Sequence, residues 1–172
     1  MKNKFVVKGE YTEIFMKTRN GIIVKTVIDT EDLQRIIENR YSISPKWDHI
    51  RKTYRAKTKV VVNGKAVLVY LYRFLVNAPD GVMVDHIDHD TLNNRKSNLR
   101  LVNNSQNLQN RKGADSDSSS GIRNVWWSKQ RRKWCVSFRT KGKHVFCGAY
   151  DSIEKAAEVA DEKRKTILSF AC

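Results

Sequence analysis

Residues 84–111 read VDHIDHDTLNNRKSNLRLVNNSQNLQNR, and they decide the fold expected for this chain. Around and within them, residues 82–87 have the pattern of a short strand, residues 88–98 form a polar loop, and Leu99–Val102 is a second strand. Ser105 follows as a candidate helix cap, because its hydroxyl can accept a backbone N–H. The stretch therefore predicts the order strand, loop, strand, helix.

The charge of the chain indicates a polyanionic partner. Its 172 residues carry 33 Lys and Arg against 18 Asp and Glu, a formal net charge of +15. Basic blocks lie at both ends, net +8 in residues 1–84 and net +7 in residues 119–172. Such a field attracts nucleic acid first and anionic membrane second.

Membrane-spanning and secreted proteins are disfavoured. No apolar run approaches the roughly 20 residues of a membrane helix, and the opening MKNKFVVKGEYTE contains no apolar signal segment. Cys135, Cys147 and Cys172 form no CxxC pair, which argues against a disulfide scaffold and against a structural zinc. We therefore expect a cytoplasmic protein that does not act at a membrane.

The first 80 residues are expected to be rich in strands. Asn20-Gly21 and Asn63-Gly64 each stand beside runs of Val and Ile, which is typical of hairpin turns. Between them a helix with Leu33, Ile36 and Ile37 on its apolar face is predicted, capped by Asp29 or Thr30. Residues 71–76 fit either a strand or a short helix, and residues 78–81 fit a turn.

The polar stretch resembles the HNH endonuclease motif, which has the ββα-metal fold. The residues that carry the resemblance are Asp85-His86, Leu92–Arg95, Asn98–Val102 and Ser105–Arg111, in that order. More loosely, Lys8–Ile14, Val27–Thr30, Leu71–Arg73 and residues 78–81 resemble the N-terminal region of phage HNH homing endonucleases, which implies the cytoplasm of a bacterial host.

The resemblance implies a role for each matched residue. Asp85 corresponds to the first metal ligand, His86 to the general base, and Asn107 to the second metal ligand. Asn94 corresponds to the Asn that braces the loop. Oxygen ligands favour one Mg²⁺ or Mn²⁺ over zinc, and a divalent cation beside a neutral imidazole suits phosphodiester hydrolysis.

The direction of the Asp85 and His86 side chains and the residues at positions 72, 73 and 89 need separate interpretation. Adjacent residues of a strand point to opposite sides, so Asp85 and His86 would diverge unless the strand end twists, which the resemblance implies. His89 stands where relatives commonly have Gly, and we interpret it as a solvated loop residue. Tyr72 stands where relatives often have His, and Arg73 fits a phosphate contact and a surface residue equally well.

The nine residues Gly113–Gly121, GADSDSSSG, cannot bury an apolar face and are predicted to form a flexible linker. We expect four parts on this basis: a β-rich DNA-contacting region at 1–80, the HNH motif at 81–112, the linker at 113–121, and a second basic module at 122–172. The fold class is α+β.

The second module is predicted to contain three strands and a helix. The strands are expected at Val125–Trp127, Trp134–Arg139 and Val145–Gly148, and the helix from a cap at Ser152 to about residue 169. By alternation, Trp134, Val136 and Phe138 should pack on the helix, and Cys135, Ser137 and Arg139 should face DNA.

This module resembles the DNA-binding domain of plant ethylene-response factors, which lays a three-stranded antiparallel sheet in the major groove. Ser120–Arg123, Lys133-Trp134, residues 144–151 and Glu154–Ala157 carry the resemblance. The positions that match its contact residues are Arg123, Arg131, Arg139, His144 and Phe146. Of these, His144 and Phe146 stand where Arg and Trp are common, which implies an altered base preference.

The sequence as a whole predicts a metal-dependent HNH endonuclease that cuts or nicks double-stranded DNA at a specific site, as a homing endonuclease does, and acts as a monomer. The alternatives are a catalytically inactive DNA-binding transcriptional regulator and, more weakly, an RNA-binding protein. The expected DNA contacts are Arg73, Arg95, Arg111, Arg123, Arg131, Arg132, Arg139, Lys141, Lys143, His144 and Phe146.

Overall fold

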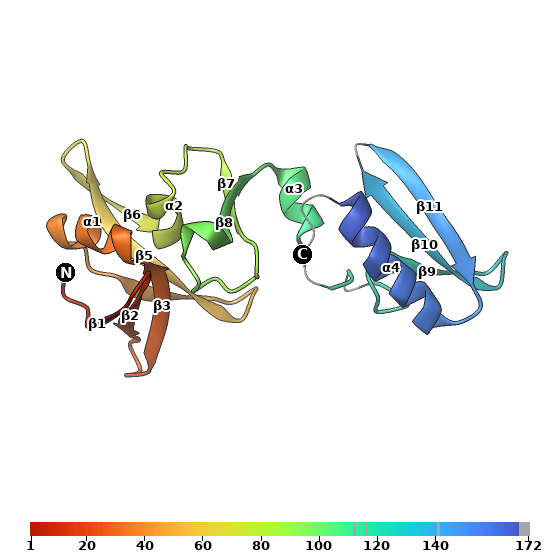
Figure 1. Ribbon diagram of the computed structural model, residues 1–172, viewed down its shortest axis with the longest axis horizontal. Coiled ribbons are helices and arrows are strands. Elements are labelled where there is room, and N and C mark those ends of the chain that lie inside the picture. The colour runs from red at the N-terminus through yellow and green to blue at the C-terminus, as the bar shows by residue number, and fades with distance from the viewer. Residues whose placement is uncertain (112, 116, 141, 169–172) are drawn as a thin grey trace. The chain divides into compact units, whose positions relative to one another are not determined.

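The computed structural model describes residues 1–111, 113–115, 117–140 and 142–168 (Figure 1). It divides into two compact units, Met1–Asn103 and Asn104–Cys172. Both units are built from small antiparallel sheets with a few helices. Lys112, Lys141 and Cys172, which the sequence predictions include, lie outside the described residues. No helix in the described ranges is long and apolar enough to span a bilayer.

The first sheet of the first unit has three strands, β1 (Phe5–Lys8), β2 (Tyr11–Lys17) and β3 (Ile23–Asp29), in that order. β2 and β3 pair along their whole length, from Tyr11 opposite Asp29 to Lys17 opposite Ile23. The turn between them contains Gly21 at a φ of 84°, a left-handed value that glycine adopts without strain. The hairpin predicted at Asn20-Gly21 is confirmed.

The second sheet consists of β4 (Ser44–Asp48), β5 (Thr53–Val62) and β6 (Lys65–Tyr70). Asn63 and Gly64 alone connect β5 to β6, with φ of 50° and 75°. Two consecutive positive φ values define the type of two-residue turn that matches the twist of the strands. The hairpin predicted at this position is confirmed as well.

Short helices join these strands. A 3-10 turn at Thr30–Asp32 leads into α1 (Leu33–Glu38), as predicted, but no side chain caps either start. The carboxylate of Asp29 is instead turned to the backbone N–H of Lys96, 2.7 Å away. Residues 71–76, for which the sequence fits a strand and a helix equally, contain the short helix α2 (Leu71–Leu75).

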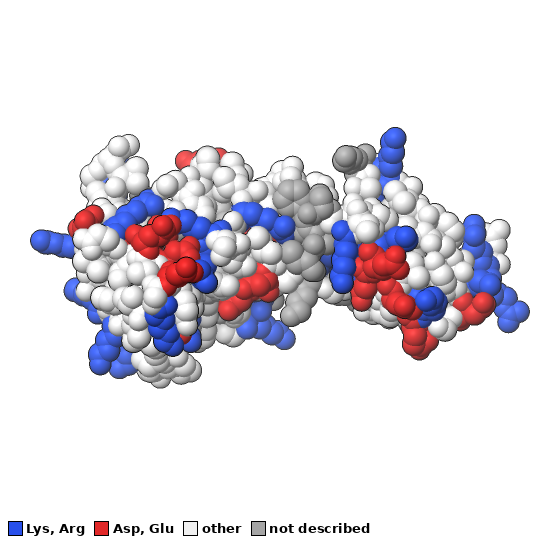
Figure 2. All heavy atoms as spheres, in the orientation of Figure 1, with Lys and Arg blue, Asp and Glu red and all other residues white. Residues whose placement is uncertain are grey.

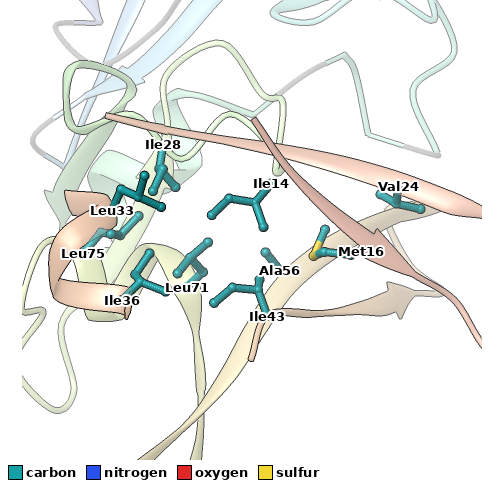
Figure 3. Close-up of a cluster of buried hydrophobic side chains, with 10 residues drawn as sticks. All are labelled: Ile14, Met16, Val24, Ile28, Leu33, Ile36, Ile43, Ala56, Leu71 and Leu75. Atoms are coloured by element: carbon teal, nitrogen blue, oxygen red, sulfur yellow. The ribbon is translucent and has the colours of Figure 1, made fainter. Parts of the chain in front are cut away.

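The core of this unit lies between the two three-stranded sheets and the helices α1 and α2 (Figure 3). Ile14, Ile28, Ile36 and Leu71 are completely buried there. Their alternation along β2 and β3 and their helical spacing in α1 place one apolar side of each element inward. The members of the cluster are Ile14, Met16, Val24, Ile28, Leu33, Ile36, Ile43, Ala56, Leu71 and Leu75.

Residues 83–102 form the hairpin that the sequence predicts. β7 (Met83–His86) pairs with β8 (Leu99–Val102), and the loop between them ends in a 3-10 turn at Lys96–Asn98. The helix that follows is α3 (Asn104–Gln109), which belongs to the second unit. Ser105 was expected before the helix, but it lies inside, because the helix starts one residue earlier at Asn104.

The second unit also contains a three-stranded sheet with one helix on it. β9 (Val125–Ser128), β10 (Lys133–Thr140) and β11 (Lys143–Tyr150) pair in the order β11-β10-β9, and α4 (Ile153–Ile167) lies against the sheet (Figure 1). Val136, Phe138, Ala156 and Ala160 form the centre of the core between them. The Ser152 hydroxyl accepts the N–H of Lys155 at 3.1 Å, as predicted for the cap.

Candidate active site

Asp85 and His86 end strand β7 and face different neighbours. Asp85 lies opposite Arg100 on β8, whose Nε and terminal nitrogen donate to one carboxylate oxygen at 3.1 and 2.9 Å. Only 12% of the Asp85 side chain is exposed. The carboxylate is therefore held in a fixed position by a charged partner on the neighbouring strand.

His86 is buried, with 7% of its surface exposed. The edge of its ring packs against Tyr72 on α2, with ring centroids 5.1 Å apart, and its Nε2 lies 3.1 Å from Oδ1 of Asn94. Burial lowers the pKa of His86, and the bond to Asn94 and the nearby carboxylates counteract this only in part. The imidazole is thus held neutral near pH 7, the form that can accept a proton.

The loop after His86 is closed by its own polar side chains. Asp88 accepts the side-chain N–H groups of Asn93 at 2.7 Å and Asn98 at 2.8 Å, and the backbone N–H of Asp90 at 2.8 Å. Burial alone would raise the pKa of Asp88, but these hydrogen bonds lower it overall. The carboxylates of Asp88 and Asp90 therefore hold the backbone of the loop in shape.

His89 has a φ of 67°, in the left-handed region. Glycine adopts that conformation without cost, whereas a residue with a side chain is strained there. Its backbone N–H donates to the carbonyl of His86 at 3.1 Å. The position is therefore constrained by the backbone of the turn.

The same loop is bonded to strand β3 of the N-terminal sheet. Val27 donates its N–H to Leu92 at 2.9 Å and accepts the N–H of Asn94 at 2.8 Å, which makes a parallel bridge. Two residues on, Asp29 accepts Arg95 Nε at 3.0 Å and the N–H of Lys96. Sequence reasoning missed these partners, because they lie more than 60 positions away and carry no motif.

Two of the expected DNA contacts in the first unit make bonds within the protein. The guanidinium of Arg73 donates to the carbonyls of Val82 at 2.6 Å and Pro79 at 2.7 Å, closing the turn before β7. Arg95 lies over the ring of Tyr11, 5.8 Å from its centroid, in addition to its pair with Asp29.

Asn107, which the sequence predicts as the second metal ligand, lies on α3 in the second unit and is half-buried. Arg111, just after this helix, pairs with Asp115. Arg123 donates to the carbonyls of Leu108 at 3.0 Å and Gln109 at 2.9 Å, so its guanidinium caps the end of α3. Its placement gives it a structural task that the sequence did not indicate.

The sheet of the second unit, β9 to β11, carries other predicted DNA contacts on the face away from α4. Arg139 lies directly opposite His144, and Ser137 lies opposite Phe146, after a bulge between Val136 and Ser137. The guanidinium of Arg131 lies 5.0 Å from the centroid of the Phe146 ring. Besides Arg111, the exposed residues of the predicted set are Arg131, Arg132, Arg139, Lys143, His144 and Phe146.

One residue of that face departs from the prediction. Cys135 was expected to face DNA, but it is completely buried. It lies between Trp126 on β9 and Ala149 on β11. The indole of Trp126 reaches across the face to donate to Ser137 at 3.1 Å, which leaves the small thiol covered.

The distribution of charged side chains and the available metal ligands bear on what the site can bind. On the side of each unit visible in Figure 2, acidic and basic side chains are interspersed. Within the described ranges, no three His, Cys, Asp or Glu side chains gather as a metal cluster. Asp85 nevertheless offers the oxygen donor that a hard divalent cation prefers, and the other ligands would be amide, water and phosphate oxygens.

Comparisons with known proteins identify relatives of this arrangement. The family model described as HNH endonuclease matches residues 77–109. Protein 3.8 of Escherichia phage T7 is 33% identical over 93 residues, which are 54% of this chain and 76% of that protein. The uncharacterized HNH endonuclease L560 of Acanthamoeba polyphaga mimivirus is 34% identical over 88 residues and is covered over 46% of its length. No solved structure matches the chain.

Proposed function

This chain belongs to the HNH family of DNA endonucleases, and from that premise we propose that it nicks double-stranded DNA at a specific site with a divalent metal. The observation that supports this most directly is the buried His86, whose Nε2 lies 3.1 Å from Oδ1 of Asn94 and whose pKa is lowered by burial. Its imidazole accepts a proton from the attacking water, and Asp85 would hold the metal. When bound, Mg²⁺ or Mn²⁺ neutralises charge on the scissile phosphate and the leaving oxygen.

A plasmid-nicking assay tests this proposal. In Mg²⁺, His86→Ala should slow nicking by about 100-fold or more, because the general base is lost, while DNA binding stays unchanged. His89→Gly is the matched control, since glycine suits its left-handed backbone. If wild type and His86→Ala are equally inert while both bind DNA, the chain is a non-catalytic DNA-binding regulator.

We also propose, from the sequence pattern, that Asn107 supplies the second metal ligand. Removing one oxygen ligand weakens the metal site, so Asn107→Ala should raise the Mn²⁺ concentration needed for half-maximal nicking by about tenfold. Asn104→Ala changes an exposed amide of the same helix and serves as its control. An unchanged metal requirement in Asn107→Ala would remove this residue from the site.

For the second unit we propose that the outer face of its sheet enters the major groove. A two-stranded ribbon fits that groove, and the exposed Arg139 and His144 lie side by side on the adjacent strands β10 and β11. Arg139→Ala should weaken binding to the specific site by about 1–3 kcal/mol. Lys165→Ala, exposed on α4 over the opposite face, should change it little. Equal loss on every sequence would make Arg139 a phosphate contact.

We propose further that the protein is a homing endonuclease and that it acts as a monomer. One active site per chain makes a single-strand nick the expected product, and two DNA-binding parts give the long contact that rare cutting requires. Selection of cleaved sites from a random duplex library should return one extended sequence. Random cleavage throughout the library would contradict the site-specific role.

A further inference from the structure

A buried line of hydrogen bonds connects the centre of strand β3 to His86. Thr26 is completely buried, and its hydroxyl lies 2.8 Å from the carbonyl oxygen of Leu92. Nδ2 of Asn94 lies 2.8 Å from the same hydroxyl. At the other end of its amide, Asn94 places Oδ1 at 3.1 Å from Nε2 of His86.

Only one direction of donation satisfies every bond in this line. The carbonyl of Leu92 can only accept, so the single proton of the Thr26 hydroxyl points to it. Towards Asn94 the hydroxyl is then an acceptor, and the amide must turn its NH₂ to Thr26 and its oxygen to His86. An amide oxygen only accepts, so Nε2 of His86 carries the proton.

The fixed proton decides which nitrogen can act. In a neutral imidazole one nitrogen donates and the other accepts, so a proton on Nε2 leaves the lone pair on Nδ1. The opposite tautomer would leave Nδ1 protonated and unable to take a proton from water. A hydroxyl on the N-terminal sheet therefore determines the basic atom of a residue 60 positions later in the chain.

The surrounding backbone keeps this line in register. The carbonyl of Leu92 also accepts the N–H of Val27, and the N–H of Asn94 donates to the carbonyl of Val27. Thr26 thus lies at the point where the loop is bonded to β3, and Asn94 is only 1% exposed.

We infer that Thr26 is a positioning residue, which sets the tautomer of His86 through Asn94. The inference rests on the proposed role of His86 as general base, but the tautomer itself can be observed without DNA or metal. Substitution of Thr26 by Val keeps the shape and removes the acceptor. The Asn94 NH₂ then keeps only its longer contact with the carbonyl of Leu92, at 3.4 Å, so the amide can turn over, present NH₂ to Nε2 and favour a proton on Nδ1.

The test is a long-range ¹H–¹⁵N spectrum of the imidazoles of the full-length protein, at a pH where they are neutral. The chain has four histidines, and the spectrum of His86→Ala identifies the signal of His86. Wild type and Thr26→Ser should show a proton on Nε2, and Thr26→Val should show the Nδ1 tautomer or a mixture. Nicking by Thr26→Val should fall at least tenfold, with Thr26→Ser restoring it and DNA affinity unchanged.

Thr12→Val controls for the loss of a buried hydroxyl from the same sheet. Thr12 is also completely buried, on β2, and its hydroxyl contacts Thr30 at 3.0 Å. It should keep the Nε2 proton and the nicking rate. A wild-type proton on Nδ1, or a Thr26→Val protein with wild-type tautomer and rate, overturns the inference. Equal nicking by wild type and His86→Ala would overturn only the proposed function, because the tautomer is read separately.

Discussion

The two units place their polar side chains in opposite ways. In the first, His86, Asn94 and Thr26 are buried and bonded to one another. In the second, Arg139 and His144 stand exposed on a sheet whose other face packs on α4. Chemistry needs atoms fixed to a fraction of an ångström, whereas groove recognition needs side chains that can reach out. The four predictions below test this division, from the largest effect to the smallest.

Asn94→Ala should have the largest effect, because it removes the centre of the buried line. We expect nicking to fall by about 100-fold and the free energy of unfolding to fall by about 1–3 kcal/mol, since Thr26 and His86 each lose a partner. Single-turnover nicking and thermal unfolding measure the two quantities. Asn39→Ala removes only an exposed hydrogen bond to the carbonyl of Arg35 at the end of α1 and should leave nicking unchanged. Full activity in Asn94→Ala would show that the buried arrangement is dispensable.

Asp85→Asn should weaken nicking by about tenfold to 100-fold at low Mn²⁺. The amide loses the negative charge that attracts a divalent cation, and Arg100 loses its ion pair. Titration of the metal should restore part of the rate, which separates metal binding from misfolding. Asp80→Asn, on the exposed turn before β7, is the control. A loss that metal does not recover at all would assign Asp85 a purely structural role.

Lys143→Gln should affect binding and leave the chemical step alone. If Lys143 contacts one phosphate, the slope of log affinity against log salt should become shallower by about 0.9. His86→Ala should leave the slope unchanged. Fluorescence anisotropy with a labelled duplex between 50 and 200 mM salt, where affinity is expected to fall by about 10³–10⁵-fold overall, gives both values. A salt effect confined to His86→Ala would reverse the division between the units.

Ser152→Ala should have the smallest effect. It removes the side chain that accepts the Lys155 N–H, which costs about 1 kcal/mol of stability in the second unit. Amide exchange along α4 should accelerate, while nicking of saturating DNA should stay within twofold of wild type. Ser152→Thr retains a capping hydroxyl and should behave as wild type. A large loss of nicking in Ser152→Ala would indicate that α4 contributes to catalysis.

Local chemistry made much of the fold predictable from the sequence. Asn63-Gly64 demands a two-residue turn, and Ser152 followed by an apolar stripe demands a capped helix; both are confirmed. Leu71–Leu75 could not be decided, because a short apolar run fits a buried strand or a buried helix equally well. Tertiary packing, which decided it, leaves no local trace.

The candidate site was predictable in its residues but not in its connections. Asp85, His86 and Asn94 carry a motif, and the motif spacing singled them out. Thr26 reads as one polar residue in an alternating strand, and only the register between β3 and the loop reveals its contact with Asn94. The prediction that Cys135 faces DNA was wrong for a related reason. Alternation along a strand gives the face on which a residue lies, but not whether a neighbour such as Trp126 covers it.

The parallel bridge between Val27 and Asn93 limits how this motif can be transferred to another protein. The segment that the family model recognises is residues 77–109, yet the loop within it takes its backbone bonds from Val27 and its line of side-chain bonds from Thr26. The ring of Tyr72, also outside that segment, packs on His86. The recognised motif is therefore not a portable part. A graft of residues 77–109 alone would carry His86 but leave behind Thr26 and Tyr72, which hold its surroundings in place here. The smallest transferable piece therefore includes the N-terminal sheet.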